Sequence, residues 1–278
     1  MKQIYTRLTV AVLFIFICCS IAAAERGDTI KILAIGNSFS EDAAEEYLDD
    51  LARAADIPVV IGNACIGGCS LERHYNNVIG QSANYSYRKI NAKGEKTTTP
   101  DQTLLQCILD EDWDYITLQQ ASPLSGKADT YFPYLNRLVG FVRSRATNPQ
   151  MKPAFHQTWA YAGDFKHENF APYNYDQEQM YNAIVEAVNN AVSQTGITIV
   201  IPSGVAIQKA RITMQKDNFC RDGYHLNKGI GRYTAACAWF ETLSGKPVTE
   251  NTFYPESITE EEAVIVREAA HSAVKEFN

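Results

Sequence analysis

The sequence lacks an excess of positive charge. Its 25 Lys and Arg residues are outnumbered by 32 Asp and Glu residues, and the 278-residue chain carries a formal net charge of −7. Proteins that bind nucleic acid do so through clusters or stripes of Lys and Arg. No such stripe occurs along this chain, so we expect no nucleic-acid partner.

Long hydrophobic runs are absent after the first two dozen residues. Lys2 and Arg7 precede an apolar stretch at 8–21 and three alanines, which is the order of a secretory signal peptide. The stretch is shorter than the about 20 residues that a membrane-spanning helix needs. We predict a signal peptide at 1–24, no membrane span, and export to the periplasm or the extracellular space. Loss of the two cations takes the net charge from −7 to −9.

Cysteine is scarce. After the predicted signal peptide the cysteines are Cys65, Cys69, Cys107, Cys220 and Cys237. An odd number leaves at least one thiol unpaired and excludes a disulfide scaffold. A local bridge between Cys65 and Cys69 is one interpretation, and burial as small apolar side chains is the other. With His74 these two cysteines lack the spacing of familiar zinc sites, so we expect no metal.

The chain alternates β-like and helical segments. Apolar, β-branched runs occupy residues 30–35, 59–63, 115–118, 153–158 and 197–201. Helical patterns occupy residues 41–54, 103–109, 132–145, 176–194, 229–243 and 259–277. This alternation predicts a mostly parallel five-stranded sheet covered on both faces. Because no linker, repeat or low-complexity tract occurs, we expect residues 25–278 to form a single domain.

Two segments interrupt the alternation. Residues 85–90 and 95–99 flank a turn-rich tetrapeptide, which predicts a surface β-hairpin insert at 85–99. Residues 159–175 are rich in aromatic side chains and have little periodicity. A long aromatic loop at the end of a strand can form a substrate wall or simply cover the sheet, and both interpretations stay open.

Two polar fragments occupy positions suited to catalysis. Gly-Asn-Ser at 36–38 ends the first β-like run, and Asp-Gly-Tyr-His at 222–225 precedes a predicted helix. Open α/β sheets build their sites at the carboxyl ends of strands. Serine needs a base to take its proton, and imidazole titrates near neutral pH. We therefore predict Ser38 as nucleophile, His225 as base and Asp222 as the group that orients the imidazole. The alternative is that 36–38 is only a turn and helix cap.

These fragments resemble two sequence blocks of the SGNH or GDSL hydrolases, Gly-Asp-Ser and the late Asp-x-x-His. Asn-Ala-Cys-Ile-Gly-Gly at 63–68 resembles the block whose last glycine donates an N–H to the oxyanion hole. The resemblance assigns that role to Gly68, with Gly67 in reserve. Where the family has Gly-x-Asn-Asp, this chain reads Leu-Gln-Gln at 118–120. We transfer the role of the Asn to Gln119.

The resemblance spans nearly all the chain after the signal peptide. With Trp-Asp-Tyr at 113–115 and Gln-Thr-Trp-Ala-Tyr at 157–161, it is similar to an SGNH-like branch common in gut Bacteroidetes. It implies a flavodoxin-like three-layer α/β/α sandwich and ester hydrolysis without a metal or other cofactor. The implied oxyanion hole comprises Ser38, Gly68 and Gln119. Weaker candidates for substrate contact are Asn37, Gln120, Trp159 and Tyr161.

We therefore predict a secreted serine esterase that forms an acyl-Ser38 intermediate on a small-molecule or glycan ester. Carbohydrate O-acyl groups are favoured by the resemblance rather than by any residue. The alternative is a carbohydrate-binding protein on the same scaffold, with catalysis weakened by the Asn-to-Gln change. A metal-assisted phosphoesterase would need a cluster of carboxylates or histidines at one strand edge, and we find none in the sequence.

Overall fold

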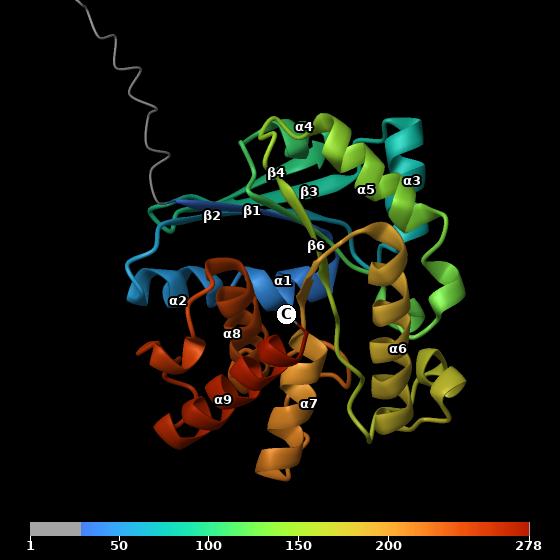
Figure 1. Cartoon of the computed structure of the whole chain (residues 1–278). Coiled ribbons are helices and arrows are strands. Elements are labelled where there is room, and N and C mark those ends of the chain that lie inside the picture. The colour runs from blue at the N-terminus through green and yellow to red at the C-terminus, as the bar shows by residue number, and fades with distance from the viewer. Residues whose placement is uncertain (1–28, 278) are drawn as a thin grey trace, which may run out of the picture.

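A computed structural model describes residues 29–277 and consists of a central sheet between helices (Figure 1). The predicted signal peptide at 1–24 lies outside the described residues. The sheet order is β4-β3-β2-β1-β5-β6-β7. The strands are β1 (Ile30–Gly36), β2 (Val59–Cys65), β3 (Tyr85–Ile90), β4 (Lys96–Gln102), β5 (Tyr115–Leu118), β6 (Lys152–His156) and β7 (Ile199–Ile201). The predicted α/β class is confirmed.

Strand β1 is the switch point of the strand order, with β2 to β4 on one side of it and β5 to β7 on the other. It pairs in parallel with β2 on one side and with β5 on the other, and β6 and β7 continue in parallel beyond β5. Gly36 pairs with Cys65, and Ile35 pairs with Leu118. The carboxyl ends of these three strands are therefore neighbours. In open α/β sheets such a switch point is where ligand sites form.

The sheet has seven strands, which corrects the predicted five. Strands β3 and β4 form a hairpin, and β3 pairs with β2 in the antiparallel direction. The hairpin thus extends the sheet instead of standing apart on the surface. Strand β4 is exposed from Lys96 to Asp101 and contains Pro100, a residue typical of sheet edges because it cannot donate to a further strand. Hairpin signals are local, whereas pairing with β2 depends on the tertiary fold.

Helices cover both faces of the sheet (Figure 1). One layer comprises α3 (Leu71–Gly80), α4 (Leu104–Leu109) and α5 (Tyr134–Arg145). The other comprises α1 (Ser38–Ala44), α2 (Leu48–Ala54), α7 (Ser203–Met214), α8 (Ile230–Ser244) and α9 (Glu260–Phe277). Helix α6 (Gln177–Thr195) contacts α5 and α7. Short 3₁₀ segments are η1 (Ser122–Leu124), η2 (Ala128–Thr130), η3 (Glu168–Tyr173) and η4 (Val248–Glu250).

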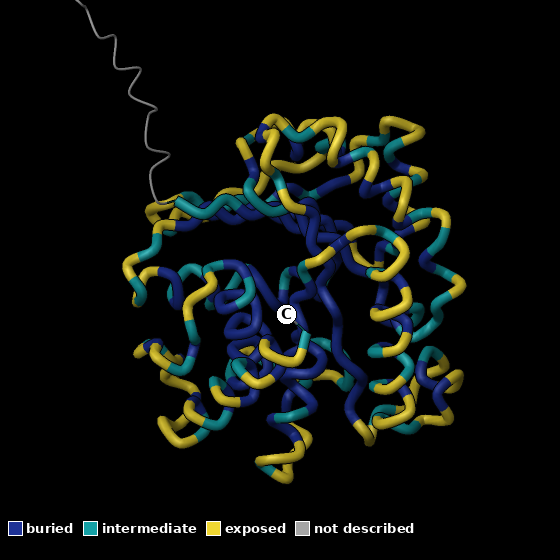
Figure 2. The backbone as a smooth tube through the Cα atoms, in the orientation of Figure 1, coloured by how far each residue is buried: buried dark blue, intermediate teal, exposed yellow. Residues whose placement is uncertain are grey.

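Burial follows these layers (Figure 2). Strand β1 is buried from its third residue to its end, as expected for a parallel strand covered on both faces. Helix α8 is buried on nearly every side. Helices α3 and α7 have no counterpart among the predicted segments, and the predicted helix at 41–54 is divided into α1 and α2. Because α7 is buried on most sides, its sequence lacks the single apolar stripe that marks an amphipathic helix.

The five cysteines within residues 29–277 are free thiols, and Cys65 and Cys69 are buried. Of the two interpretations of this pair, the structure therefore has the buried small side chains. His74 is also buried, and its Nδ1 lies 2.9 Å from the Tyr85 hydroxyl. Within residues 29–277, none of the helices combines the length and the apolar character needed to cross a bilayer.

Candidate active site

The nucleophile turn follows β1 directly. A Cβ on Gly36 would lie 2.4 Å from the Ser40 Oγ, so glycine is the residue that fits there. Asn37 caps α1, because its Oδ1 accepts a 2.9 Å hydrogen bond from the Phe39 N–H. Ser38 is the first residue of α1 and lines an open cavity. The cap and the candidate nucleophile are thus two different residues.

The candidate base lies in a tight loop before α8, residues 221–226, here called the base loop. Asp222 Oδ1 accepts hydrogen bonds from the N–H groups of Tyr224 (3.3 Å) and His225 (2.8 Å). The Arg221 N–H donates to the His225 carbonyl over 2.8 Å. Gly223 has a φ of +91°, a left-handed conformation that favours glycine. These local bonds place the carboxylate beside its own histidine.

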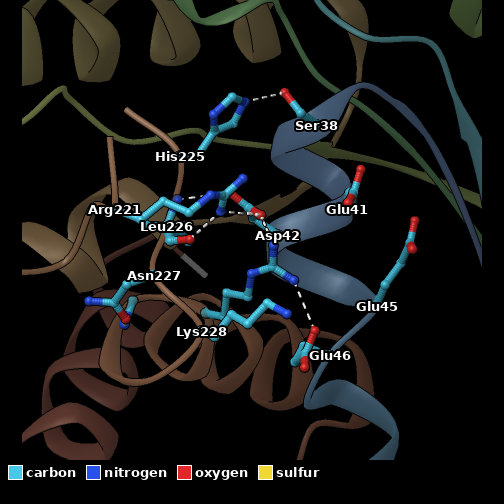
Figure 3. Close-up of polar contacts among 12 residues, drawn as sticks. Ser38, Glu41, Asp42, Glu45, Glu46, Arg221, His225, Leu226, Asn227 and Lys228 are labelled. Atoms are coloured by element: carbon cyan, nitrogen blue, oxygen red, sulfur yellow. Dashed lines mark hydrogen bonds and ion pairs between the residues drawn. The ribbon is translucent and has the colours of Figure 1, made fainter. Parts of the chain in front are cut away.

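The structure brings Ser38, His225 and Asp222 into one hydrogen-bonded line. His225 Nε2 lies 2.9 Å from the Ser38 Oγ (Figure 3), and His225 Nδ1 lies 2.7 Å from Asp222 Oδ2. An Nδ1–H donated to the carboxylate leaves Nε2 to accept the serine hydroxyl. Partial burial acts to raise the pKa of Asp222, but hydrogen bonds from His225 and from the Tyr224 N–H outweigh it and lower the pKa. An ionised carboxylate here can stabilise an imidazolium.

Asp42 fastens the base loop to the helix that carries Ser38 (Figure 3). Its Oδ2 accepts a 2.8 Å hydrogen bond from the Leu226 N–H, and its Oδ1 lies 3.1 Å from Arg221 Nη1. A second guanidinium, that of Arg232, lies 2.5 Å from Oδ1. Burial raises the pKa of Asp42, although the two arginines oppose that rise. One buried carboxylate therefore binds both Arg221 and Leu226, the residues on either side of the segment 222–225.

Two backbone N–H groups are available for an oxyanion. Within residues 29–277, neither the Ser38 N–H nor the Gly68 N–H donates to a protein acceptor, and both residues line the cavity. Gly68 has a φ of +61°, and a Cβ there would meet nothing within 4 Å. Asn37 Nδ2 donates over 3.0 Å to the Cys69 carbonyl and so ties the nucleophile turn to the glycine loop. Gly67 also lines the cavity and remains the reserve candidate.

The structure corrects the role predicted for Gln119. Its side chain is buried beneath the nucleophile turn and does not line the cavity. The amide Nε2 donates over 2.9 Å to Asn37 Oδ1, and Oε1 lies 2.9 Å from His156 Nδ1. His156 Nε2 in turn lies 3.0 Å from the Ser203 Oγ. With its amide committed inside the protein, Gln119 supports the Asn37 cap and does not donate to an oxyanion.

Gln120 is likewise turned away from the cavity, which corrects its prediction as a substrate contact. Its Oε1 accepts hydrogen bonds from the N–H groups of Leu71 (3.1 Å) and Ala121 (2.9 Å). Its Nε2 donates to the Thr130 carbonyl and hydroxyl, each over 3.1 Å. The side chain thus satisfies backbone groups where the loop after β5 meets α3 and η2.

The aromatic loop at 159–175 contributes both to the core and to the cavity. Trp159 is fully buried, stacks on Phe39 with ring centroids 4.2 Å apart, and donates to the Tyr224 carbonyl. It supports the site from beneath and does not touch the cavity, contrary to its prediction. Tyr161 does line the cavity, and its hydroxyl lies 3.0 Å from the Ser122 Oγ.

The cavity has a volume of about 900 Å³. Its lining residues are Asn37, Ser38, Phe39, Gly67, Gly68, Ser70, Ala121, Ser122, Pro123, Leu124, Tyr161, Phe165, His167, Asn169, Tyr224 and His225. Lys, Arg, Asp and Glu are absent from this described lining. Elsewhere in residues 29–277, as in the cavity, no group of three or more His, Cys, Asp or Glu side chains is arranged to hold a metal ion.

Sequence reasoning missed three contributors to the site. Asp42 is four residues after Ser38 and hence on the same side of α1. In the sequence, however, an acidic residue at this place looks like any acid in the first turn of a helix. His156 lies within the predicted strand at 153–158 and is a strand residue, yet nothing in the sequence pairs it with Gln119. Phe165 belongs to the aromatic-rich segment at 159–175, and nothing in the sequence indicates that it lines the cavity with His225.

The chain matches a known family and solved structures. The family described as Domain of unknown function (DUF4886) matches residues 31–273. A crystal structure of a DUF4886 family protein from Bacteroides uniformis is 50% identical, with a TM-score of 0.87 over 89% of this chain and 95% of that chain. No match to a curated protein sequence is found.

More distant structures share the fold. A proposed SGNH hydrolase from Slackia heliotrinireducens is 19% identical, with a TM-score of 0.50 over 77% of this chain and 98% of that one. A variant of an acetyl-xylooligosaccharide esterase from Geobacillus stearothermophilus is 12% identical, with a TM-score of 0.50 over 77% of this chain and 94% of that one. The three-layer sandwich of the SGNH hydrolases is thereby confirmed, and the chain belongs to the DUF4886 family.

Proposed function

We propose that the protein is a serine esterase that hydrolyses a neutral O-acyl ester through an acyl-Ser38 intermediate. The observation that carries this proposal is the line from Ser38 Oγ through His225 to Asp222, with separations of 2.9 and 2.7 Å, at the wall of an open cavity. Nucleophile, base and orienting carboxylate are the three groups that acyl transfer requires.

The reaction follows from these positions. His225 Nε2 accepts the proton of the Ser38 hydroxyl as Oγ attacks the ester carbonyl, and Asp222 stabilises the imidazolium that forms. The Ser38 and Gly68 N–H groups donate to the developing oxyanion. His225 then passes the proton to the departing alcohol oxygen. In the second half a water molecule attacks the acyl-serine with His225 again as base, and His225 returns the proton to the departing Ser38 Oγ as the carboxylic acid is released.

Carbohydrate esters are the substrate class that we propose to test first. An acetyl-xylooligosaccharide esterase shares the fold, and the uncharged lining of the cavity suits a neutral ester. We also propose that the protein is exported after removal of residues 1–24, which N-terminal sequencing of the mature protein would check.

A fluorophosphonate probe tests the esterase proposal directly, because it bonds covalently only to an activated serine. We expect stoichiometric labelling of the wild type at Ser38, located by mass spectrometry of the labelled peptide, and none in Ser38→Ala. A wild-type protein that folds and does not label would overturn the proposal.

The alternative is a carbohydrate-binding protein with little catalysis. One observation favours it: neither the Gln119 nor the Gln120 amide faces the cavity, so a side-chain donor at the position of the family's Asn is missing. Loss of one oxyanion donor lowers rates by about 10²- to 10³-fold in other serine hydrolases. Binding of xylo-oligosaccharides without fluorophosphonate labelling would support this alternative.

A further inference from the structure

A row of aromatic rings begins at the candidate base and extends along the cavity. The Tyr224 ring lies 4.0 Å from the His225 imidazole, measured between centroids. Phe165 follows at 5.5 Å from Tyr224, and His167 stacks on Phe165 at 5.5 Å with an interplanar angle of 4°. All four residues line the cavity, so the row forms one continuous face of it.

The row is held firmly against the base loop. The Ala162 N–H donates over 2.8 Å to the Gly223 carbonyl, and the Phe165 N–H donates over 3.1 Å to the Ala162 carbonyl. A Cβ on Gly223 would lie 2.1 Å from the Phe165 ring, so the ring packs directly on the backbone of the base loop. Tyr161 supports Phe165 from the side, edge to face at 5.3 Å. The position of the rings relative to His225 is therefore set by the fold.

The chemistry of this face suits a neutral ring that is apolar on one side and polar at its edge. Aromatic rings offer broad apolar surfaces, while ring nitrogens and hydroxyls provide polar contacts at their rims. Asn169 and the exposed His167 add polar groups to the same part of the cavity. Because no Lys, Arg, Asp or Glu is in the described lining, a charged ligand would find no counter-ion there.

The mechanism assigns a direction to this face. In acyl transfer the base delivers its proton to the departing alcohol oxygen, so the alcohol part of the ester must lie on the His225 side of Ser38. The aromatic row starts there. We propose that Tyr224, Phe165 and His167 form a subsite for the alcohol part of the ester, and that this part is a neutral sugar ring that packs against the row at Phe165. The assignment rests on the proposed esterase function.

The test compares esters that share an acetyl group and differ in the alcohol: acetylated xylo-oligosaccharide, phenyl acetate and ethyl acetate. Phe165→Ala should lower kcat/KM for the sugar ester by about three- to tenfold, the range of one lost aromatic contact. It should change hydrolysis of ethyl acetate less than twofold. Phe165→Tyr, which keeps the ring, should restore the wild-type value for the sugar ester.

Leu124→Ala is the matched control, since Leu124 lines the cavity without belonging to the row. We expect it to change hydrolysis of the acetylated sugar and ethyl acetate by the same factor. Equal losses on these two esters in Phe165→Ala, or no loss on either, would overturn the subsite. A loss of kcat/KM on phenyl acetate alone would rule out a sugar as the alcohol part of the ester and indicate an aromatic alcohol. If Phe165→Ala fails to fold, the exposed His167→Ala gives the same comparison with a smaller selective loss.

A binding measurement separates failure of the subsite from failure of the esterase. Calorimetry with deacetylated xylo-oligosaccharide, the product alcohol, needs no turnover and can be done on Ser38→Ala. We expect binding that weakens three- to tenfold when Phe165→Ala is added. If the wild type binds the sugar through Phe165 but does not label with fluorophosphonate, the sugar subsite stands and the esterase proposal fails. Labelling without any sugar binding would retain the esterase and overturn the subsite.

Discussion

Within residues 29–277, serine and histidine side chains form hydrogen-bonded pairs at two places, the cavity wall and the core. Ser38 Oγ lies 2.9 Å from His225 Nε2, and Ser203 Oγ lies 3.0 Å from His156 Nε2. In each pair the second ring nitrogen has a partner of its own, within 2.7 Å and 2.9 Å. By distances alone, both resemble the hydrogen-bonded line of a serine hydrolase.

The two pairs differ in the third residue and in their surroundings. The outer pair ends on Asp222, whose lowered pKa favours a carboxylate that can balance an imidazolium. The inner pair ends on Gln119, which is neutral. Burial lowers the pKa of His156 from the ordinary value of 6.5 to about 3, so this ring stays neutral and cannot accept a proton from serine at neutral pH. Hydrogen-bond distances thus do not by themselves identify a catalytic site, because the site also needs a charge partner and access.

The inner pair has a structural role that the outer pair depends on. With Gln119 Oε1 as acceptor, His156 Nδ1 donates to it and His156 Nε2 accepts the Ser203 hydroxyl. The Gln119 amide then points its N–H to Asn37 Oδ1. Since Asn37 caps the helix that begins at Ser38, this buried chain fixes the turn that presents the candidate nucleophile.

The largest difference between the two pairs should appear when each serine is replaced by alanine. Ser38→Ala should lower kcat by about 10⁴- to 10⁶-fold and abolish fluorophosphonate labelling. Ser203→Ala should label at the wild-type rate and lose only about 1 kcal/mol of unfolding free energy, the worth of one hydrogen bond. Labelling kinetics and urea unfolding of both variants check this, and labelling at Ser203 would contradict it.

Asp222→Asn gives the outer pair a neutral amide like that of the inner pair. We expect kcat to fall by about 10²- to 10⁴-fold, because the imidazolium loses its counter-charge and the ring its preferred tautomer. The residual rate should exceed that of Ser38→Ala, since nucleophile and base are both kept. Steady-state kinetics on acetylated xylo-oligosaccharides measure it, and a rate within threefold of wild type would argue against Asp222 as the orienting group.

Gln119→Ala should show how far the outer pair depends on the inner one. Asn37 loses a supporting donor, so we expect kcat to fall by about 10- to 100-fold through misplacement of Ser38, with KM little changed. Unfolding free energy should fall by about 1–3 kcal/mol because the His156 Nδ1–H is left without its acceptor. Gln120→Ala is the control: a similar loss of stability is expected with kcat within threefold of wild type. A larger kcat effect in Gln120→Ala would contradict the assignment.

The pH dependence of stability tests the inner pair separately from catalysis. Burial lowers the pKa of His156, and also of His74, from 6.5 to about 3. Because the unfolded chain binds more protons in this window, stability is full above about pH 6.5 and falls as pH drops toward 3. His156→Gln should remove one histidine's share of that slope. Urea unfolding at a series of pH values measures the slope, and an unchanged slope in the variant would contradict a neutral buried His156.

Much of the fold could be predicted from the sequence because its signals are local. The five parallel strands correspond to β-branched runs, and the hairpin was indicated by its turn. The sheet's full width was not predicted, since pairing of β3 with β2 joins residues whose patterns carry no information about each other. The division of the predicted helix at 41–54 into α1 and α2 was also missed.

For the candidate site, the sequence by itself determined what lies within a few residues along the chain. Gly36, Asn37 and Ser38 form a turn and cap through their own conformational preferences, and Asp222 binds the backbone and ring of His225 three residues later. Contacts of this range require only the local backbone. Such contacts can therefore be predicted from a single sequence.

Only the tertiary structure decided which distant side chains meet. The loop after β5 turns Gln119 inward, where it contacts Asn37 and His156. Asp42 binds the base loop to α1. Which way a side chain faces at the end of a strand depends on how the neighbouring strands and helices pack around it. That packing is a property of the whole chain, and no short fragment of the sequence contains it.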